Sequence, residues 1–112
     1  MNRSAFISTL AVLLTMAGSA IAADELTTFT LTLKDNKFDQ ELLEVPSGQK
    51  MVLVIKNLDS TAEEFESKDL KLEKIVPAGK EVRLNVGPLK PGQYKFVGEY
   101  HEKTAHGVLI AK

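Results

Sequence analysis

The chain has 112 residues, a formal net charge of −1 and neither cysteine nor tryptophan. This length allows one ordinary domain, and the near-neutral charge argues against a nucleic-acid-binding protein, which needs a basic face. The lack of cysteine excludes disulfides, zinc–thiolate sites, iron–sulfur clusters, thiol nucleophiles and a copper–thiolate bond. Any site chemistry therefore depends largely on the two histidines, His101 and His106.

The first 22 residues have the layout of a cleaved secretory signal peptide. Arg3 is the only charged residue in this stretch, residues 5–17 are mainly apolar, and Ala20-Ile21-Ala22 fits a small-residue cleavage pattern. A membrane helix is the alternative, but the apolar run is shorter than the roughly 20 residues that cross a bilayer. We therefore expect residues 1–22 to be removed and residues 23–112 to form the exported domain.

The rest of the chain shows the two-residue periodicity of β-strands. Apolar and polar side chains alternate over residues 28–33, 50–56, 81–86 and 93–97, and an apolar run at 108–111 closes the chain. Alternation of this kind is typical of strands with one buried face. Helical periodicity of any length is missing after the signal, so the sequence predicts an all-β domain.

Proline and glycine between these runs predict turns at Pro46-Ser47-Gly48, Pro77-Ala78-Gly79, Gly87-Pro88 and Pro91-Gly92. Evenly spaced short strands with such turns indicate an antiparallel β-sandwich of the Greek-key type. Residues 58–74 are less regular, and there we expect a strand starting at Phe65, followed by an irregular crossing or one helical turn. Tyr94 fits a tyrosine corner, in which the hydroxyl bonds the backbone of the preceding turn.

Six motifs spread over the chain after residue 27 form one recognisable pattern. They are Val45-Pro46-x-Gly48, Asn57-x-Asp59, Glu64-Phe65-Glu66, Val76-Pro77-Ala78-Gly79-Lys80, Leu89-x-Pro91-Gly92-x-Tyr94-x-Phe96 and the segment from His101 to Gly107. Together they resemble the cupredoxin fold, a Greek-key β-sandwich. The third and sixth motifs are similar to the cupredoxin-like component of bacterial periplasmic iron-uptake systems that work with an FTR-type permease.

The plastocyanin-like copper loop of that fold can be laid on the C-terminal segment, with the tyrosine corner setting the register. The cysteine ligand then falls on Gly98, the late histidine on His101 and the methionine on His106, while the early histidine falls near Glu64. The resemblance therefore implies a loop of retained spacing in which three of the four ligand types have changed. It keeps two imidazoles near a carboxylate.

Two histidines and a carboxylate are a recognised metal-binding set, which suits non-haem Fe(II) with open positions or Cu(II) in tetragonal form. Acidic residues packed together raise one another's pKa, and a bound cation relieves that repulsion. The predicted metal ligands are Glu64, His101 and His106, with Glu66 and Glu99 as further ligands or supporting charges. The neighbouring acids expected to be solvated are Glu63, Asp69 and Glu102.

The resemblance implies a periplasmic metal-binding protein that takes part in ferrous iron uptake and binds copper, iron or both. Its implied partners are an inner-membrane FTR-type iron permease and a companion periplasmic iron or copper protein. Whether the domain accepts an electron from Fe(II) or only carries iron stays open at this stage. Two alternatives are a periplasmic copper-handling protein unrelated to iron and a metal-free module that only docks to a partner.

Overall fold

A computed structural model describes residues 26–112, which form strands and one short 3-10 turn. The elements are β1 (Thr27–Lys34), β2 (Lys37–Phe38), β3 (Leu42–Val45), β4 (Met51–Asn57), β5 (Glu63–Ser67), β6 (Leu72–Val76), β7 (Glu81–Val86), β8 (Gly92–Gly98), η2 (Glu99–His101) and β9 (His106–Ala111). The all-β prediction is confirmed. Among the described residues, no helix has the length and apolar character needed to cross a membrane. The expected signal peptide, residues 1–22, lies outside the described part.

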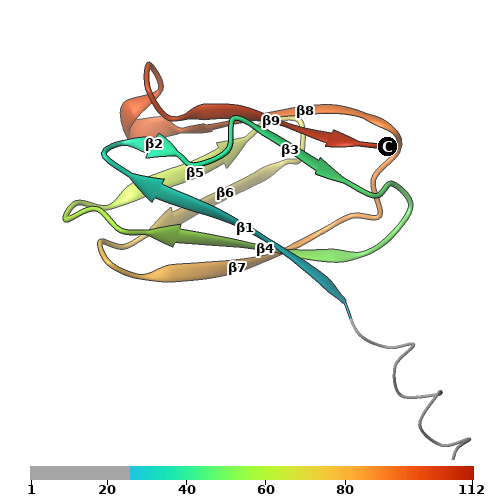
Figure 1. Cartoon of the computed structure of the whole chain (residues 1–112), viewed down its shortest axis with the longest axis horizontal. Coiled ribbons are helices and arrows are strands. Elements are labelled where there is room, and N and C mark those ends of the chain that lie inside the picture. The colour runs from blue at the N-terminus through green and yellow to red at the C-terminus, as the bar shows by residue number, and fades with distance from the viewer. Residues whose placement is uncertain (1–25) are drawn as a thin grey trace, which may run out of the picture.

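The strands build two layers, which Figure 1 shows stacked on each other with η2 at one end of the sandwich. One sheet has the order β2-β1-β4-β7 and the other the order β3-β9-β8-β5-β6. The expected purely antiparallel pairing is wrong in two places, because β1 pairs with β4 and β3 with β9 in parallel. The chain leaves the first sheet after β2 and crosses to the second sheet before it returns as β4, so β1 and β4 run in the same direction.

The core fills the space between the layers with every second residue of the strands. Three phenylalanine rings pack against one another in this core. Their ring centroids are 5.1 Å apart for Phe38 and Phe96, 5.6 Å for Phe65 and Phe96, and 6.3 Å for Phe38 and Phe65. All three rings are buried. Aromatic pairs at these separations add to the energy of area burial. They fix β5 and β8 side by side, and these are the strands that position the candidate site.

Residues 58–74 are more regular than the sequence indicates. The strand expected at Phe65 begins at Glu63, and instead of an irregular crossing it is followed by a hairpin to β6. The turn of this hairpin holds Lys71 at φ 59°. Strand β5 contains only one apolar residue, Phe65, so its alternation of buried and partly exposed positions is not visible as a pattern of apolar residues.

Two of the motifs have structural roles. The Tyr94 hydroxyl donates to the Lys90 carbonyl at 2.7 Å, which confirms the tyrosine corner. The buried Asn57 side chain donates to the carbonyls of Thr61 and Val76 at 2.9 and 3.0 Å and accepts from the Asp59 N–H at 2.9 Å. These bonds fix the segment that leads into β5.

Candidate metal site

Strand β5 carries carboxylates on both of its faces. Successive side chains of a strand point to opposite sides, and here Glu63, Phe65 and Ser67 are buried while Glu64 and Glu66 are partly exposed. The acids of this region therefore form two separate groups. An inner group lies at the end of the core, and an outer group lies on the outward surface of the five-stranded sheet.

The inner group is a carboxylate–imidazole pair. The Oε2 atom of Glu63 lies 2.7 Å from Nδ1 of His101, and Oε1 accepts hydrogen bonds from the backbone N–H groups of Tyr100 at 2.8 Å and Glu64 at 3.0 Å. The Glu63 side chain is only 4% exposed, against 32% for His101. A buried carboxylate needs such partners, and this one has three.

The expectation that Glu63 is solvated is therefore wrong, and the acid that faces inward near the early histidine position is Glu63, not Glu64. A shift of one residue moves a side chain to the other face of the strand. Counting back in steps of two from the apolar Phe65 gives Glu63 as the inward residue, which is the signal that could have found it. The exposed Asp69 side chain has a hydrogen-bond partner in the protein, because its Oδ2 atom accepts from the Lys95 N–H at 2.9 Å.

Gly98 leaves room for the Glu63 carboxyl group. A Cβ atom at position 98 would stand 2.8 Å from the Glu63 Cδ atom and 2.9 Å from the Ala105 Cβ atom, closer than real contacts allow. The Gly98 N–H donates to the Ala105 carbonyl at 2.9 Å, and Ala105 is fully buried. The inward space around position 98 is thus occupied by protein atoms.

His106 lies apart from this pair. It begins β9 opposite Val97 of β8, its side chain is 51% exposed, and its Nδ1 atom is 4.0 Å from the Glu41 Oε2 atom. Within residues 26–112, three side chains of the types that bind metals lie close enough to share one ion. Neither histidine is among them. The structure brings His101 together with Glu63, but it does not bring the two histidines together with Glu64.

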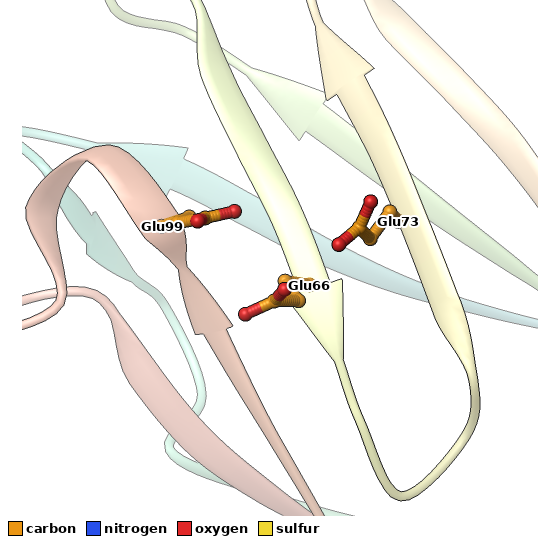
Figure 2. Close-up of side chains that lie close together, drawn as sticks. All are labelled: Glu66, Glu73 and Glu99. Carbon is orange, nitrogen blue, oxygen red and sulfur yellow. The ribbon is translucent and has the colours of Figure 1, made fainter.

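The outer group is a cluster of glutamates from three chain segments. One carboxylate oxygen from each of Glu66, Glu73 and Glu99 can be chosen so that all three atoms lie within 4.8 Å of one another. Figure 2 shows these side chains on β5, on β6 and just beyond the end of β8, gathered over the same patch of the sheet. Two of the predicted residues, Glu66 and Glu99, belong to this cluster. Glu73 counts among the neighbouring acids in the sequence but not among the predicted ligands, because its place depends on the β5–β6 register.

Two acids of this cluster, Glu66 and Glu99, have a raised pKa. The pKa of Glu66 lies above its usual value because the side chain shares a hydrogen bond with Glu73, with partial loss of water contact and the charges of Glu99 and Glu73 as smaller causes. For Glu99 the main cause is a hydrogen bond with Glu64, followed by partial loss of water contact and the charges of Glu64 and Glu73. Lys68 opposes both shifts. Glu64 thus joins the outer cluster as a partner of Glu99.

The outer cluster borders a shallow depression of about 380 Å³. Glu66 and Glu99 line it together with two cationic side chains, Lys68 and Lys95, and the third predicted solvated acid, Glu102. The depression is open to solvent, so a hydrated ion or an acidic ligand of an ion has access to the carboxylates. Carboxylates gathered at the border of an accessible hollow can bind a cation through oxygen atoms alone.

Comparison with known proteins gives one family and a set of structural neighbours. Residues 6–111 match the model of the cupredoxin-like domain family. The uncharacterized protein RP394 of Rickettsia prowazekii (strain Madrid E) is 44% identical over 87 residues, which cover 78% of this chain and 70% of that protein.

Several solved structures share the fold at low sequence identity. Auracyanin A, a blue copper protein of Chloroflexus aurantiacus, superposes with a TM-score of 0.66 at 13% identity, covering 79% of this chain and all of that one. Auracyanin of Roseiflexus castenholzii gives 0.62 at 15% identity over 77% and 97% of the two chains. A Cu(I) form of an amicyanin mutant gives 0.63 at 14% identity over 81% and 89%. At this level of identity the likeness establishes the fold alone.

Proposed function

Because this chain belongs to the cupredoxin-like domain family, we propose that it is a periplasmic cation-binding protein that serves iron uptake. The cation is iron, held as cargo by the outer cluster of Glu66, Glu73 and Glu99, with Glu64 as the hydrogen-bonding partner of Glu99. The partners are those that the resemblance implies: an inner-membrane FTR-type permease and a companion periplasmic iron or copper protein. His101 and His106, predicted ligands from the sequence, are not needed for this proposal.

The observation that carries the proposal is the approach of three carboxylates from three chain segments, with donor atoms within 4.8 Å of one another. Carboxylates at this separation repel one another when ionised. The pKa of Glu66 and of Glu99 is raised mainly by hydrogen bonds with Glu73 and Glu64, and the charges of neighbouring acids add to both shifts. A multivalent cation removes the cost and replaces it with attraction. Oxygen-only ligands favour hard cations, and among the transition metals this favours iron over Cu(I).

The backbone supports the cluster from behind. Glu66 stands between Phe65 and Ser67, which are both buried, and the Ser67 hydroxyl donates to the Lys95 carbonyl at 2.6 Å while accepting from the Leu70 N–H at 3.1 Å. The β5–β6 turn is therefore tied to β8. Carboxylates on rigid strands lose little further freedom when they bind an ion.

Titration calorimetry tests the cation site. We expect the chelator-treated chain to bind Fe(II) under anaerobic conditions, or Fe(III), more tightly than Ca²⁺. The paired substitution Glu66→Gln and Glu99→Gln is expected to lower iron affinity by at least about tenfold, since each removes a ligand charge. Glu81→Gln is the matched control, because Glu81 is an exposed glutamate on β7 of the other sheet.

Two results would contradict the proposal: no iron binding by the unmodified chain, or unchanged iron affinity in the paired variant. Tight Cu(II) binding with no response to either iron ion would favour the copper-handling alternative. The uptake role is tested in cells, where deletion of the gene is expected to lower the uptake of radioactive iron. Complementation by the paired variant should fail, while complementation by Glu81→Gln should succeed.

A further inference from the structure

The side chains at the η2 end do not fit the copper centre that the cupredoxin fold implies. A blue copper site needs a cysteine thiolate and two imidazoles around the metal. The resemblance places that thiolate at position 98, which is a glycine here, and the Glu63 Cδ atom lies 2.8 Å from where the first side-chain atom would stand. The remaining space is closed by the buried Ala105.

We propose that the Glu63–His101 pair replaces the metal ion as the link that holds this end of the domain together. In a metal centre, one ion ties a strand to the loop that carries its other ligands. Here one carboxylate does so, because Glu63 of β5 bonds the His101 ring at 2.7 Å and the Tyr100 N–H at 2.8 Å, both in η2.

The loop closes around the same histidine. The His101 carbonyl accepts hydrogen bonds from the Ala105 N–H at 2.8 Å and the Thr104 N–H at 3.1 Å. The His101 ring is hydrogen-bonded to Glu63 of β5, and its backbone carbonyl is bonded to the end of the loop. His101 therefore ties the loop between β8 and β9 to the core. Both oxygen atoms of the buried Glu63 carboxylate have partners from the chain itself, so no ion is needed to satisfy this group.

The two faces of β5 carry carboxylates in different surroundings. Its inward carboxylate, Glu63, holds the loop to the core, and its outward carboxylate, Glu66, lies on the outer surface of the sheet. It follows that the domain folds fully without metal and that copper does not enter at the old position. This inference is independent of whether the outer cluster binds iron.

The experiment compares the two histidines by thermal unfolding and by Cu(II) titration. It is done in the background of Glu66→Gln with Glu99→Gln, which removes the outer cluster. We expect that chelator leaves the unfolding midpoint of this protein unchanged, and that Cu(II) does not raise it through His101. His101→Ala is expected to lower the midpoint by about 5 °C or more, while His106→Ala, which removes an exposed imidazole, changes it little.

The proposal is overturned if Cu(II) raises the midpoint of the background protein and His101→Ala abolishes the rise while His106→Ala does not. It is also overturned if His101→Ala unfolds at the same temperature as the background protein. Should His101→Ala fail to fold, Glu63→Gln takes its place, because a glutamine can keep all three hydrogen bonds. We expect Glu63→Gln to fold and Glu63→Ala to be much less stable, and equal stability of the two variants would contradict the proposal.

Discussion

Glu66 and Glu73 stand directly opposite each other across β5 and β6. Like charges in directly opposite positions destabilise a sheet. A shift of β5 by one residue would avoid this pairing only by turning Phe65 out of the core. The fold therefore holds an unfavourable pair on its outer face, and a bound cation would relieve it.

The first prediction is that this pair destabilises the cation-free protein in a pH-dependent way. The pKa of Glu66 in the folded state is raised above the ordinary value of 4.5, so the folded state holds its protons more tightly than the unfolded state. The destabilisation is absent below pH 4.5 and fully present above the raised pKa. The free energy of unfolding should thus fall as pH rises through this window.

Urea unfolding in chelator at a series of pH values checks this. Glu66→Gln should reduce the fall in the free energy of unfolding with rising pH. At pH values above the raised pKa of Glu66, this variant should be more stable than the unmodified chain. Glu81→Gln should leave the slope as it is. The same slope in Glu66→Gln and in the unmodified chain would show that the outer cluster carries no such cost.

The second prediction concerns the pH dependence of cation binding. Protons held by Glu66 and Glu99 must leave before these carboxylates bind an ion. Affinity should therefore weaken on acidification through the raised pKa of Glu66 and Glu99. Calorimetry in buffers of different ionisation enthalpy should detect proton release in that window. A transition centred near the ordinary imidazole pKa of about 6.5 would instead identify His101 or His106 as a ligand.

The sequence predicts much of this fold because its strands have one apolar face. The alternation around Leu31, Leu53 and Phe96 marks β1, β4 and β8, and the turn before Tyr94 carries its own signal. Parallel pairing of β1 with β4 is not visible in this pattern, since alternation defines which face is buried and not which strand is the neighbour.

The candidate site is harder to predict for two physical reasons. The inward acid is Glu63 because β5 has a period of two, so an alignment that is off by one residue selects its neighbour Glu64. Glu73 joins the cluster only through the register of β5 with β6, which is a contact between strands. The spacing of His101 and His106 keeps the old loop length, but η2 turns the first inward and β9 leaves the second exposed.

The third prediction is that a side chain at position 98 destabilises the fold, because neighbouring atoms fill the space that it would occupy. Gly98→Ala would place a Cβ atom 2.8 Å from the Glu63 Cδ atom and 2.9 Å from the Ala105 Cβ atom. Overpacking of this kind costs about 1–3 kcal/mol, so the urea midpoint should fall by the corresponding amount. Combining it with Ala105→Gly removes one of the two contacts and should restore part of the loss. A Gly98→Ala protein as stable as the unmodified chain would mean that Glu63 moves aside easily.

The fourth prediction tests the Asn57-x-Asp59 motif. The Asp59 carboxylate accepts from the N–H groups of Asp35 at 2.7 Å and Asn36 at 2.9 Å, and both residues have positive φ, at 56° and 59°. Non-glycine residues in that region are uncommon, so these bonds stabilise a turn that the backbone alone disfavours. Asp59→Ala should lower the free energy of unfolding by about 1–3 kcal/mol.

Ser60→Ala, at the exposed residue next to Asp59, is the matched control and should unfold like the unmodified chain. Asp59→Asn keeps one acceptor oxygen and should give an intermediate loss. Iron affinity should be the same in all three variants, because the turn between β1 and β2 belongs to the other sheet from Glu66 and Glu73. A loss of affinity in Asp59→Ala, at a temperature where the variant is folded, would mean that the cation site extends to this turn.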